Sequence, residues 1–211
     1  SSATFSVDEN QSAIGTVTAT DADGDTVTYS ISGSDITINS STGVIAFASA
    51  PDYETTTSYS ATVTAGDGTN ETTQSITVNI NNLNDNSPSF TSSATFSADE
   101  NQTAIGTIEA TDADGDTLTY SISGSDITIN SSTGVITFAS APDYETTTSY
   151  SATVTISDGS NTETQDITVS INNLNDNDPL ITSSSTFNNT ENTTEVGTIT
   201  ATDADNDTLT Y

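Results

Sequence analysis

The sequence predicts an all-β protein made of tandem seven-stranded Greek-key β sandwiches of the immunoglobulin-like type. Three observations lead to this fold class. The chain repeats itself, its apolar residues alternate with polar ones over short stretches, and no stretch shows a helical period. Hydrophobic residues make up 31% of the 211 residues, which is low but sufficient for packed domains because those residues are patterned.

The repeat is close to exact. DENQSAIG begins at Asp8 and DENQTAIG at Asp99, so the period is 99 minus 8, or 91 residues, and the two full copies differ at 16 of 91 positions. A third copy opens at Ser183 and runs to Tyr211, which is too short to close a core of its own. We place the domains at residues 1–86, 87–177 and 178–211, the last one incomplete, and expect the 211 residues to be a window on a longer repetitive polypeptide. Completion of the third copy by another chain is a weaker alternative.

Each strand of the first repeat is recognised by Val, Ile, Thr and Tyr in period-two alternation, bounded by Gly, Asn and Pro. The expected strands are Thr4–Val7, Ile14–Thr20, Val27–Ile31, Ile36–Ile38, Val44–Ala48, Tyr59–Ala65 and Ile76–Ile80. Seven antiparallel strands in about 90 residues are typical of an immunoglobulin-like sandwich.

An odd number of strands brings the chain in at one pole of a domain and out at the other. The connecting segments INNLNDNSPSF and INNLNDNDPLI are short, and each contains a proline, Pro88 or Pro179, which restricts φ. The sequence therefore predicts domains arranged end to end as a rod.

Charge narrows the functional classes. The chain has 30 Asp and Glu and no Lys, Arg or His, for a net charge of -30. Nucleic acids and anionic membrane surfaces are excluded as partners because both require Lys and Arg. No apolar run is long enough for direct membrane insertion in this window. Without Cys or His, only hard, oxygen-seeking cations such as calcium or magnesium remain plausible as bound metals.

Acidic motifs recur in both full repeats: DEN at Asp8, DAD at Asp21, DYE at Asp52 and NLNDN at Asn82, with a further Asp before Gly at Asp67. Singly, each is explained as a turn former or a solvated loop. Their combination is not explained in this way. The order E, DxD, DxE, xDG and xNDNxPxF resembles the cadherin extracellular repeat, and in particular bacterial cadherin-like repeats of large surface proteins. The resemblance covers both full repeats and the opening third of the next.

The resemblance implies calcium ions, about three per joint, bound between consecutive repeats. The implied ligands of the first joint are Glu9, Asp52, Glu54, Asn82, Asn84, Asp85 and Asn86 from one repeat, with Asp112, Asp114 and Asp158 from the next. Those of the second joint are Glu100, Asp143, Glu145, Asn173, Asn175, Asp176, Asn177, Asp203 and Asp205. Asp21, Asp23 and Asp67 would face a preceding repeat. Asn82 and Asn173 stand where the family pattern has Asp, which removes one carboxylate from each joint.

Electrostatics favours the same interpretation. Seven carboxylates at the first joint repel one another by about 4 kcal/mol per close pair at an effective dielectric of 20, and no side chain of this protein can neutralise them. About three divalent cations would nearly neutralise this charge. Calcium tolerates mixed carboxylate, amide and carbonyl ligands better than magnesium does. Without ions we expect the joint to splay and become a hinge.

These observations predict a calcium-rigidified repeat region of an extracellular fibre, stalk or adhesin, secreted or at the cell surface, whose partners are further copies of the same repeat. Lateral association of fibres and contact with a surface glycan are open. A carbohydrate-binding cadherin-like module is the alternative function, but Tyr29, Tyr53 and Tyr59 are expected to be structural. We expect no enzyme, since the acidic pair Asp52 and Glu54 recurs in each repeat and no Lys or Arg is present to hold an anion.

Overall fold

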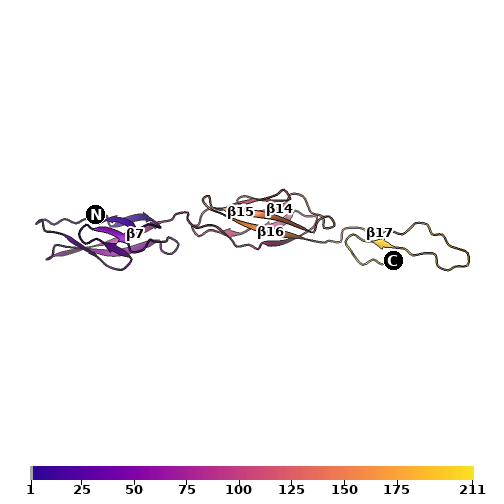
Figure 1. The fold of residues 1–211 in the computed structure, drawn as a ribbon, viewed down its shortest axis with the longest axis horizontal. Helices are drawn as coiled ribbons and strands as arrows, with labels where there is room; N and C mark the ends of the chain where they lie inside the picture. Colours follow the sequence, from indigo (N-terminus) through magenta and orange to yellow (C-terminus); the bar gives the residue numbers. More distant parts are fainter. Residues whose placement is uncertain (1) are drawn as a thin grey trace. The chain divides into compact units, whose positions relative to one another are not determined.

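The computed structural model describes residues 2–211, and within that range every regular element is a β strand (Figure 1). The chain forms two compact units. The first contains the residues up to Asn86 together with Ala113–Asp116, and the second contains Ser87–Asp112 and Thr117–Tyr211. Each unit holds a sandwich of a four-stranded and a three-stranded sheet, so the predicted all-β sandwich fold is confirmed.

The first unit contains all seven expected strands. Its four-stranded sheet has the order β1-β7-β6-β3, with bounds Thr4–Asp8, Glu71–Asn81, Ser58–Gly66 and Thr28–Ile31. Its three-stranded sheet has the order β2-β5-β4, with bounds Ala13–Thr16, Val44–Phe47 and Ile36–Ile38. The first four strands alternate between the two sheets, and β4 with β5 and β6 with β7 then form antiparallel pairs within one sheet each.

The second unit repeats this arrangement. The four-stranded sheet β12-β15-β16-β9 comprises Thr119–Ile122, Ser149–Ser157, Thr162–Asn172 and Thr95–Asp99. The three-stranded sheet β10-β14-β13 comprises Ala104–Thr107, Val135–Phe138 and Ile127–Ile129. Two short antiparallel pairs are added, β8 (Ser89–Phe90) with β11 (Ala110–Thr111) and β17 (Leu180–Ile181) with β18 (Ala201–Thr202).

Alternation along the strands builds the core. In β6 the inward residues Ala61, Val63 and Ala65 are buried, while the residues between them face outward. Across the core, the rings of Phe47 and Tyr59 meet edge-on with centroids 5.0 Å apart, and the equivalent rings of the second unit lie 5.1 Å apart. Each unit therefore has a core of its own.

One expectation about direction was wrong. β1 pairs with β7 in parallel, and β9 pairs with β16 in parallel, although all strands were expected to be antiparallel. A period-two pattern shows which face of a strand is buried, and it is the same for both directions. Strand direction depends on the route of the chain between the sheets, which alternation does not contain.

Two strand boundaries differ from the prediction by more than one residue. β7 begins at Glu71 and not at Ile76, because its polar first half pairs with β6 through backbone hydrogen bonds and needs no buried side chains. The expected strand Ile14–Thr20 ends at Thr16, after a bulge between Ala13 and Gly15. In the second unit the equivalent stretch resumes as β11.

Gly43 and Gly134 are required by the fold. They adopt φ of 71° and 69°, and a Cβ would lie 2.1 Å from the carbonyl oxygen of Val17 or 2.3 Å from that of Ile108. The backbone N–H groups of Val17 and Ile108 donate to the carbonyl oxygens of these glycines. The turn can thus approach its neighbour closely only without a side chain.

The residues after Thr182 have little packing. Phe187, Val196 and Ile199 are exposed, and β17 with β18 is the regular structure described in this part of the chain. Their apolar side chains lack a second sheet to cover them, as expected for the opening part of a repeat.

Candidate metal centre

Glu100 is the residue around which the acidic loops of the second unit are built. It is buried, with only 2% of its surface exposed. One carboxylate oxygen accepts the backbone N–H of Tyr144 at 2.7 Å, and the other accepts the backbone N–H of Leu174 at 2.8 Å. The DEN, DYE and NLNDN motifs of this repeat, far apart in sequence, are thereby joined at one carboxylate.

Four carboxylates meet at this place. Glu100, Glu145, Asp176 and Asp205 each offer one oxygen, and these oxygens lie within 4.8 Å of one another. Glu100 and Asp205 are buried, whereas Glu145 and Asp176 are exposed. The arrangement brings together four of the ligand residues proposed for the second joint.

Asp205 is docked by hydrogen bonds from the NLNDN segment. One of its oxygens accepts the backbone N–H groups of Asp176 and Asn177 at 3.0 and 2.8 Å, and the other accepts the side-chain amide of Asn177 at 2.9 Å. The side-chain amide of Asn173 donates to the backbone carbonyl of Asp205 at 3.0 Å. Asn173 therefore serves as a donor here, which its position in place of a family Asp did not suggest.

The pKa values diverge within the cluster. Burial, together with the nearby charges of Glu100 and Asp205, raises the pKa of Glu145 above its ordinary value. The side-chain and backbone hydrogen bonds from Asn177 lower the pKa of Asp205. Repulsion from neighbouring carboxylates therefore contributes to the raised pKa of Glu145, whereas hydrogen bonds outweigh the effect of burial on the pKa of Asp205.

The first unit contains the same construction. Glu9, 2% exposed, accepts the backbone N–H groups of Tyr53 and Leu83, each at 2.8 Å. Two groups of three carboxylates have oxygens within 4.8 Å of one another: Glu9 with Asp52 and Glu54, and Glu54 with Asp85 and Asp114.

Asp114 of the first unit is held as Asp205 is. The backbone N–H groups of Asp85 and Asn86 donate to one of its oxygens, at 3.0 and 2.8 Å, and the side-chain amide of Asn82 donates to its carbonyl at 2.7 Å. Burial, which raises the pKa of Asp114, is outweighed by its hydrogen bonds with Asn86 and Asp85, so that the pKa is lowered. Burial and the charges of Glu9 and Asp114 raise the pKa of Glu54.

Two kinds of residue that lie at the site were not predicted from the sequence. Asp207 offers an oxygen within 4.8 Å of those of Asp203 and Asp205, and it accepts the side-chain amide of Asn175. Its signal was present, since it is the third acid of the run DADND. Asn101, at φ 63°, donates its side-chain amide to Asp176, as Asn10 does to Asp85. Asn is one of the few residues that tolerate this backbone conformation.

Some expected ligands are engaged elsewhere. Asp143 accepts the backbone N–H and hydroxyl of Thr146, at 3.2 and 3.1 Å, within its own turn. Asp158 is buried, and it accepts the backbone N–H of Ser160 and the side-chain amide of Asn161 in its own loop. Neither belongs to an acidic cluster among the described residues. Asp112 is half-buried in the second unit, and Asn84 is half-buried in the first.

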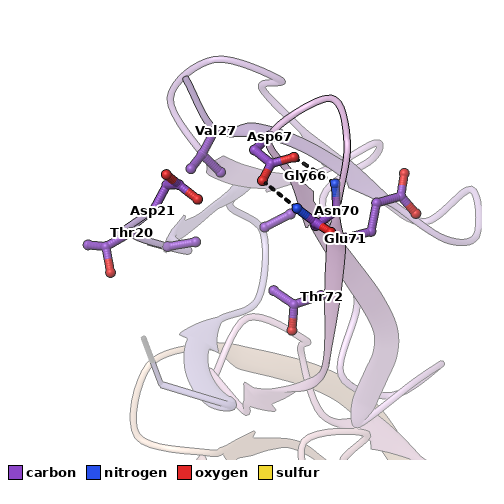
Figure 2. A pocket seen from close by; sticks show the side chains of 10 residues that line it. Thr20, Asp21, Val27, Gly66, Asp67, Asn70, Glu71 and Thr72 are labelled. Atoms are coloured by element: carbon purple, nitrogen blue, oxygen red, sulfur yellow. Dashed lines mark hydrogen bonds between the residues drawn. The ribbon is translucent and has the colours of Figure 1, made fainter. Parts of the chain in front are cut away.

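Asp21 and Asp67, expected to face a preceding repeat, line one hollow of about 150 Å³ in the first unit, together with Thr20 and Glu71 (Figure 2). Asp67 accepts the backbone N–H and the side-chain amide of Asn70, as the dashed lines show. Those bonds, with one from Thr69, lower the pKa of Asp67. Asp21 accepts the backbone N–H of Asp23 at 2.9 Å, and Asp23 is exposed.

The donor set fits a hard divalent cation. Every candidate ligand atom is a carboxylate, amide or carbonyl oxygen, because the chain has no Cys or His. Four carboxylates within 4.8 Å of one another lack any Lys or Arg to balance them. Calcium accepts six to eight such oxygens in flexible geometry, whereas zinc and copper prefer nitrogen and sulfur. Fold and site together define an all-β repeat protein with acidic loops suited to such a cation.

Known proteins identify the family. A cadherin domain is matched at residues 3–81 and again at residues 93–172. Mouse cadherin-related family member 2 is 40% identical over 90 residues, covering 41% of this chain and 6% of that protein. Mouse cadherin-23 repeats EC22–24 superpose with a TM-score of 0.73 at 25% identity, covering 95% of this chain and 74% of theirs. A cis-dimer structure of protocadherin gammaB7 EC3–6 gives a TM-score of 0.80 at 25% identity, covering 97% and 60%. The chain belongs to the cadherin family.

Membership in this family indicates where the chain is located. Cadherin domains are extracellular repeats of adhesion proteins, and they bind calcium at the linkers between repeats. The chain is therefore an extracellular region of cadherin repeats. It spans 3% to 6% of the length of the curated relatives it matches. Residues 2–211 contain no helix with the length and apolar character of a membrane span.

Proposed function

We propose that this chain is a calcium-stiffened repeat region of an extracellular fibre, stalk or adhesin. The observation that carries the proposal is the cluster of Glu100, Glu145, Asp176 and Asp205, whose oxygens lie within 4.8 Å of one another without a neutralising side chain. Bringing carboxylates this close is unfavourable unless a cation joins them, and calcium is the cation that the donor atoms suit.

The proposed domains are residues 1–86, 87–177 and 178–211, with about three calcium ions at each joint. The carboxylates of each cluster supply most of the ligands. Asn84 and Asn175 add side-chain oxygens, and Asn86 and Asn177 add backbone carbonyls. On ion binding, three further side chains reorient and coordinate the ions: Asp112, Asp143 and Asp158. Asn82 and Asn173 act as donors to the loop that carries Asp114 or Asp205, as their hydrogen bonds suggest.

The partners proposed for the chain are further copies of the same repeat, in the same polypeptide and side by side in neighbouring fibres. The solved structure of protocadherin gammaB7 EC3–6, to which the chain is similar, is a cis-dimer structure. Lateral contact between two chains of charge -30 requires bound cations to reduce their repulsion.

The role proposed is mechanical and not enzymatic. The acidic residues lie in clusters and accept hydrogen bonds from backbone N–H groups, and equivalent clusters recur in both units. A carbohydrate-binding function has no specific support, because Tyr29, Tyr53 and Tyr59 pack against the core of the first unit and are not arranged as an exposed platform.

Calcium titration of the whole chain by calorimetry tests this function. The expected result is saturable calcium binding that magnesium at the same concentration does not abolish. Asp205→Asn should weaken binding at the second-unit cluster. Asp166→Asn, which changes an Asp on the outer face of β16 bonded to Thr153, is the matched control and should leave the isotherm unchanged. No calcium binding, or equal isotherms for the wild type and Asp205→Asn, would refute the proposal.

A further inference from the structure

We propose that Asn177 and Asn86 are positioning residues whose side-chain amides hold the carboxylates of the metal centre together before an ion binds. The inference rests on the proposed calcium site, but it concerns a different property. A metal ligand binds the ion through an oxygen atom, whereas here the amide nitrogen, Nδ2, donates hydrogen bonds to the carboxylates.

In the second unit, Nδ2 of Asn177 lies within hydrogen-bonding distance of three carboxylates. It is 2.8 Å from Oδ1 of Asp176, 2.9 Å from Oδ1 of Asp205 and 3.2 Å from Oε2 of Glu145. Three of the four clustered carboxylates therefore share a single donor group. Asn177 itself is half-buried, so water competes less for these bonds than at an exposed position.

The environment determines which end of the amide faces the carboxylates. Ionised carboxylates only accept hydrogen bonds, and the carbonyl end of an amide is an acceptor as well. Turning Oδ1 toward three carboxylates would add repulsion, while turning Nδ2 toward them adds attraction. In a chain without Lys, Arg or His, amide, hydroxyl and backbone N–H groups are the donors that can do this.

The first unit contains the same arrangement. Nδ2 of Asn86 is 2.8 Å from Asp114, 2.9 Å from Asp85 and 3.3 Å from Glu54. The three acceptors of Asn86 are thus the equivalents, 91 positions earlier in the chain, of the three acceptors of Asn177. The equivalent Asn of each repeat therefore contacts the equivalent carboxylates.

The arrangement changes what is expected of the protein without calcium. Asp205 keeps three donors, the amide of Asn177 and the backbone N–H groups of Asp176 and Asn177, none of which depends on an ion. The loop that carries Asp205 therefore stays docked on the NLNDN segment in the absence of metal. Calcium then binds to carboxylates that are already gathered, which lowers the ordering cost of binding.

The variant Asn177→Asp distinguishes two roles for the Asn177 side chain, a hydrogen-bond donor to carboxylates and an oxygen ligand of calcium. This isosteric change replaces the donor with an acceptor and adds one carboxylate. If the side chain of Asn177 were an oxygen ligand, the variant would bind calcium as tightly as the wild type or more tightly. As a positioning residue, its replacement should weaken binding by about tenfold or more. Asn177→Ala, which adds no charge, should change affinity in the same direction.

A readout without calcium completes the test. In chelator, hydrogen exchange at the backbone N–H groups of Asp176 and Asn177 should be faster in both variants of the whole chain. Asn172→Ala is the matched control, because Asn172 donates to Asp99 at 2.8 Å outside the cluster, and it should change neither exchange at these two groups nor calcium affinity. Unchanged exchange, or equal or tighter calcium binding in Asn177→Asp, would overturn the inference. If the wild type binds no calcium, the proposed function fails, and the exchange measurement still decides the role of Asn177.

Discussion

The carboxylate of Glu100 accepts the backbone N–H of Tyr144 at 2.7 Å, across 44 residues of sequence. Its second oxygen reaches the N–H of Leu174. Glu9 makes the same two contacts with Tyr53 and Leu83 in the first unit. A residue that resemblance presents as a metal ligand is thus also the acceptor that holds three loops in place.

Glu100→Ala should destabilise the second unit even in chelator. Removing the carboxylate leaves two backbone N–H groups without their acceptor, and each such loss costs about 1–3 kcal/mol. We expect the free energy of unfolding in urea to fall by about 2 kcal/mol or more. Glu163→Ala, which removes an exposed Glu of the same unit, is the control and should have little effect. Equal stability of the two variants in chelator would show that Glu100 acts only through a metal.

Glu145→Gln should have opposite effects with and without calcium. The pKa of Glu145 is raised above its ordinary 4.5, so in the calcium-free protein its ionised form is disfavoured by folding. Its contribution to stability is present below pH 4.5 and is lost as pH rises through the raised value. The neutral variant should therefore melt at a higher temperature than the wild type at pH 7 in chelator, and this gain should vanish near pH 4.

The same variant should bind calcium about tenfold more weakly or worse, because a ligand carboxylate is lost. Calorimetry with and without calcium measures both effects, with Glu163→Gln as the control. A lower melting temperature of Glu145→Gln in chelator at pH 7 would contradict the assigned direction of the pKa shift.

Gly134→Ala should destabilise the second sandwich without changing calcium affinity. The added Cβ would lie 2.3 Å from the carbonyl oxygen of Ile108, in a backbone conformation that L residues rarely adopt. Gly124→Ala is a matched control, since Gly124 has φ 89° but nothing within 4 Å of its Cβ position. We expect a loss of about 1 kcal/mol for Gly124→Ala, from backbone strain alone, and a larger loss for Gly134→Ala. Equal losses would show that the contact with Ile108 relaxes freely.

The sequence predicted the strands of the fold better than their directions. Alternation located all seven strands of a repeat because each has one face toward the core, as in β6. It did not reveal the parallel pairing of β1 with β7, because a parallel and an antiparallel strand bury the same alternate residues. It also missed Glu71–Ser75, where backbone pairing extends the strand beyond the core.

At the site, some of the clustered carboxylates were predicted, but the side chains that donate hydrogen bonds to them were not. Of the carboxylates that the cadherin resemblance implied for the second joint, Glu100, Glu145, Asp176 and Asp205 lie together, whereas Asp143 lies outside this cluster. The donors were not predicted. The amides of Asn101, Asn173 and Asn177 act through their nitrogen atoms, and a sequence pattern does not show which end of an amide faces a carboxylate.

Small-angle scattering of the whole chain, in calcium and after its removal with a chelator, is the most direct test of calcium stiffening. We predict a longer maximum dimension and a narrower distribution of conformations in calcium, together with a higher melting temperature. Because each sandwich has a hydrophobic core of its own, the change on calcium removal should be a gain in bending and not a loss of the individual sandwiches. Identical scattering profiles and melting temperatures with and without calcium would contradict the account.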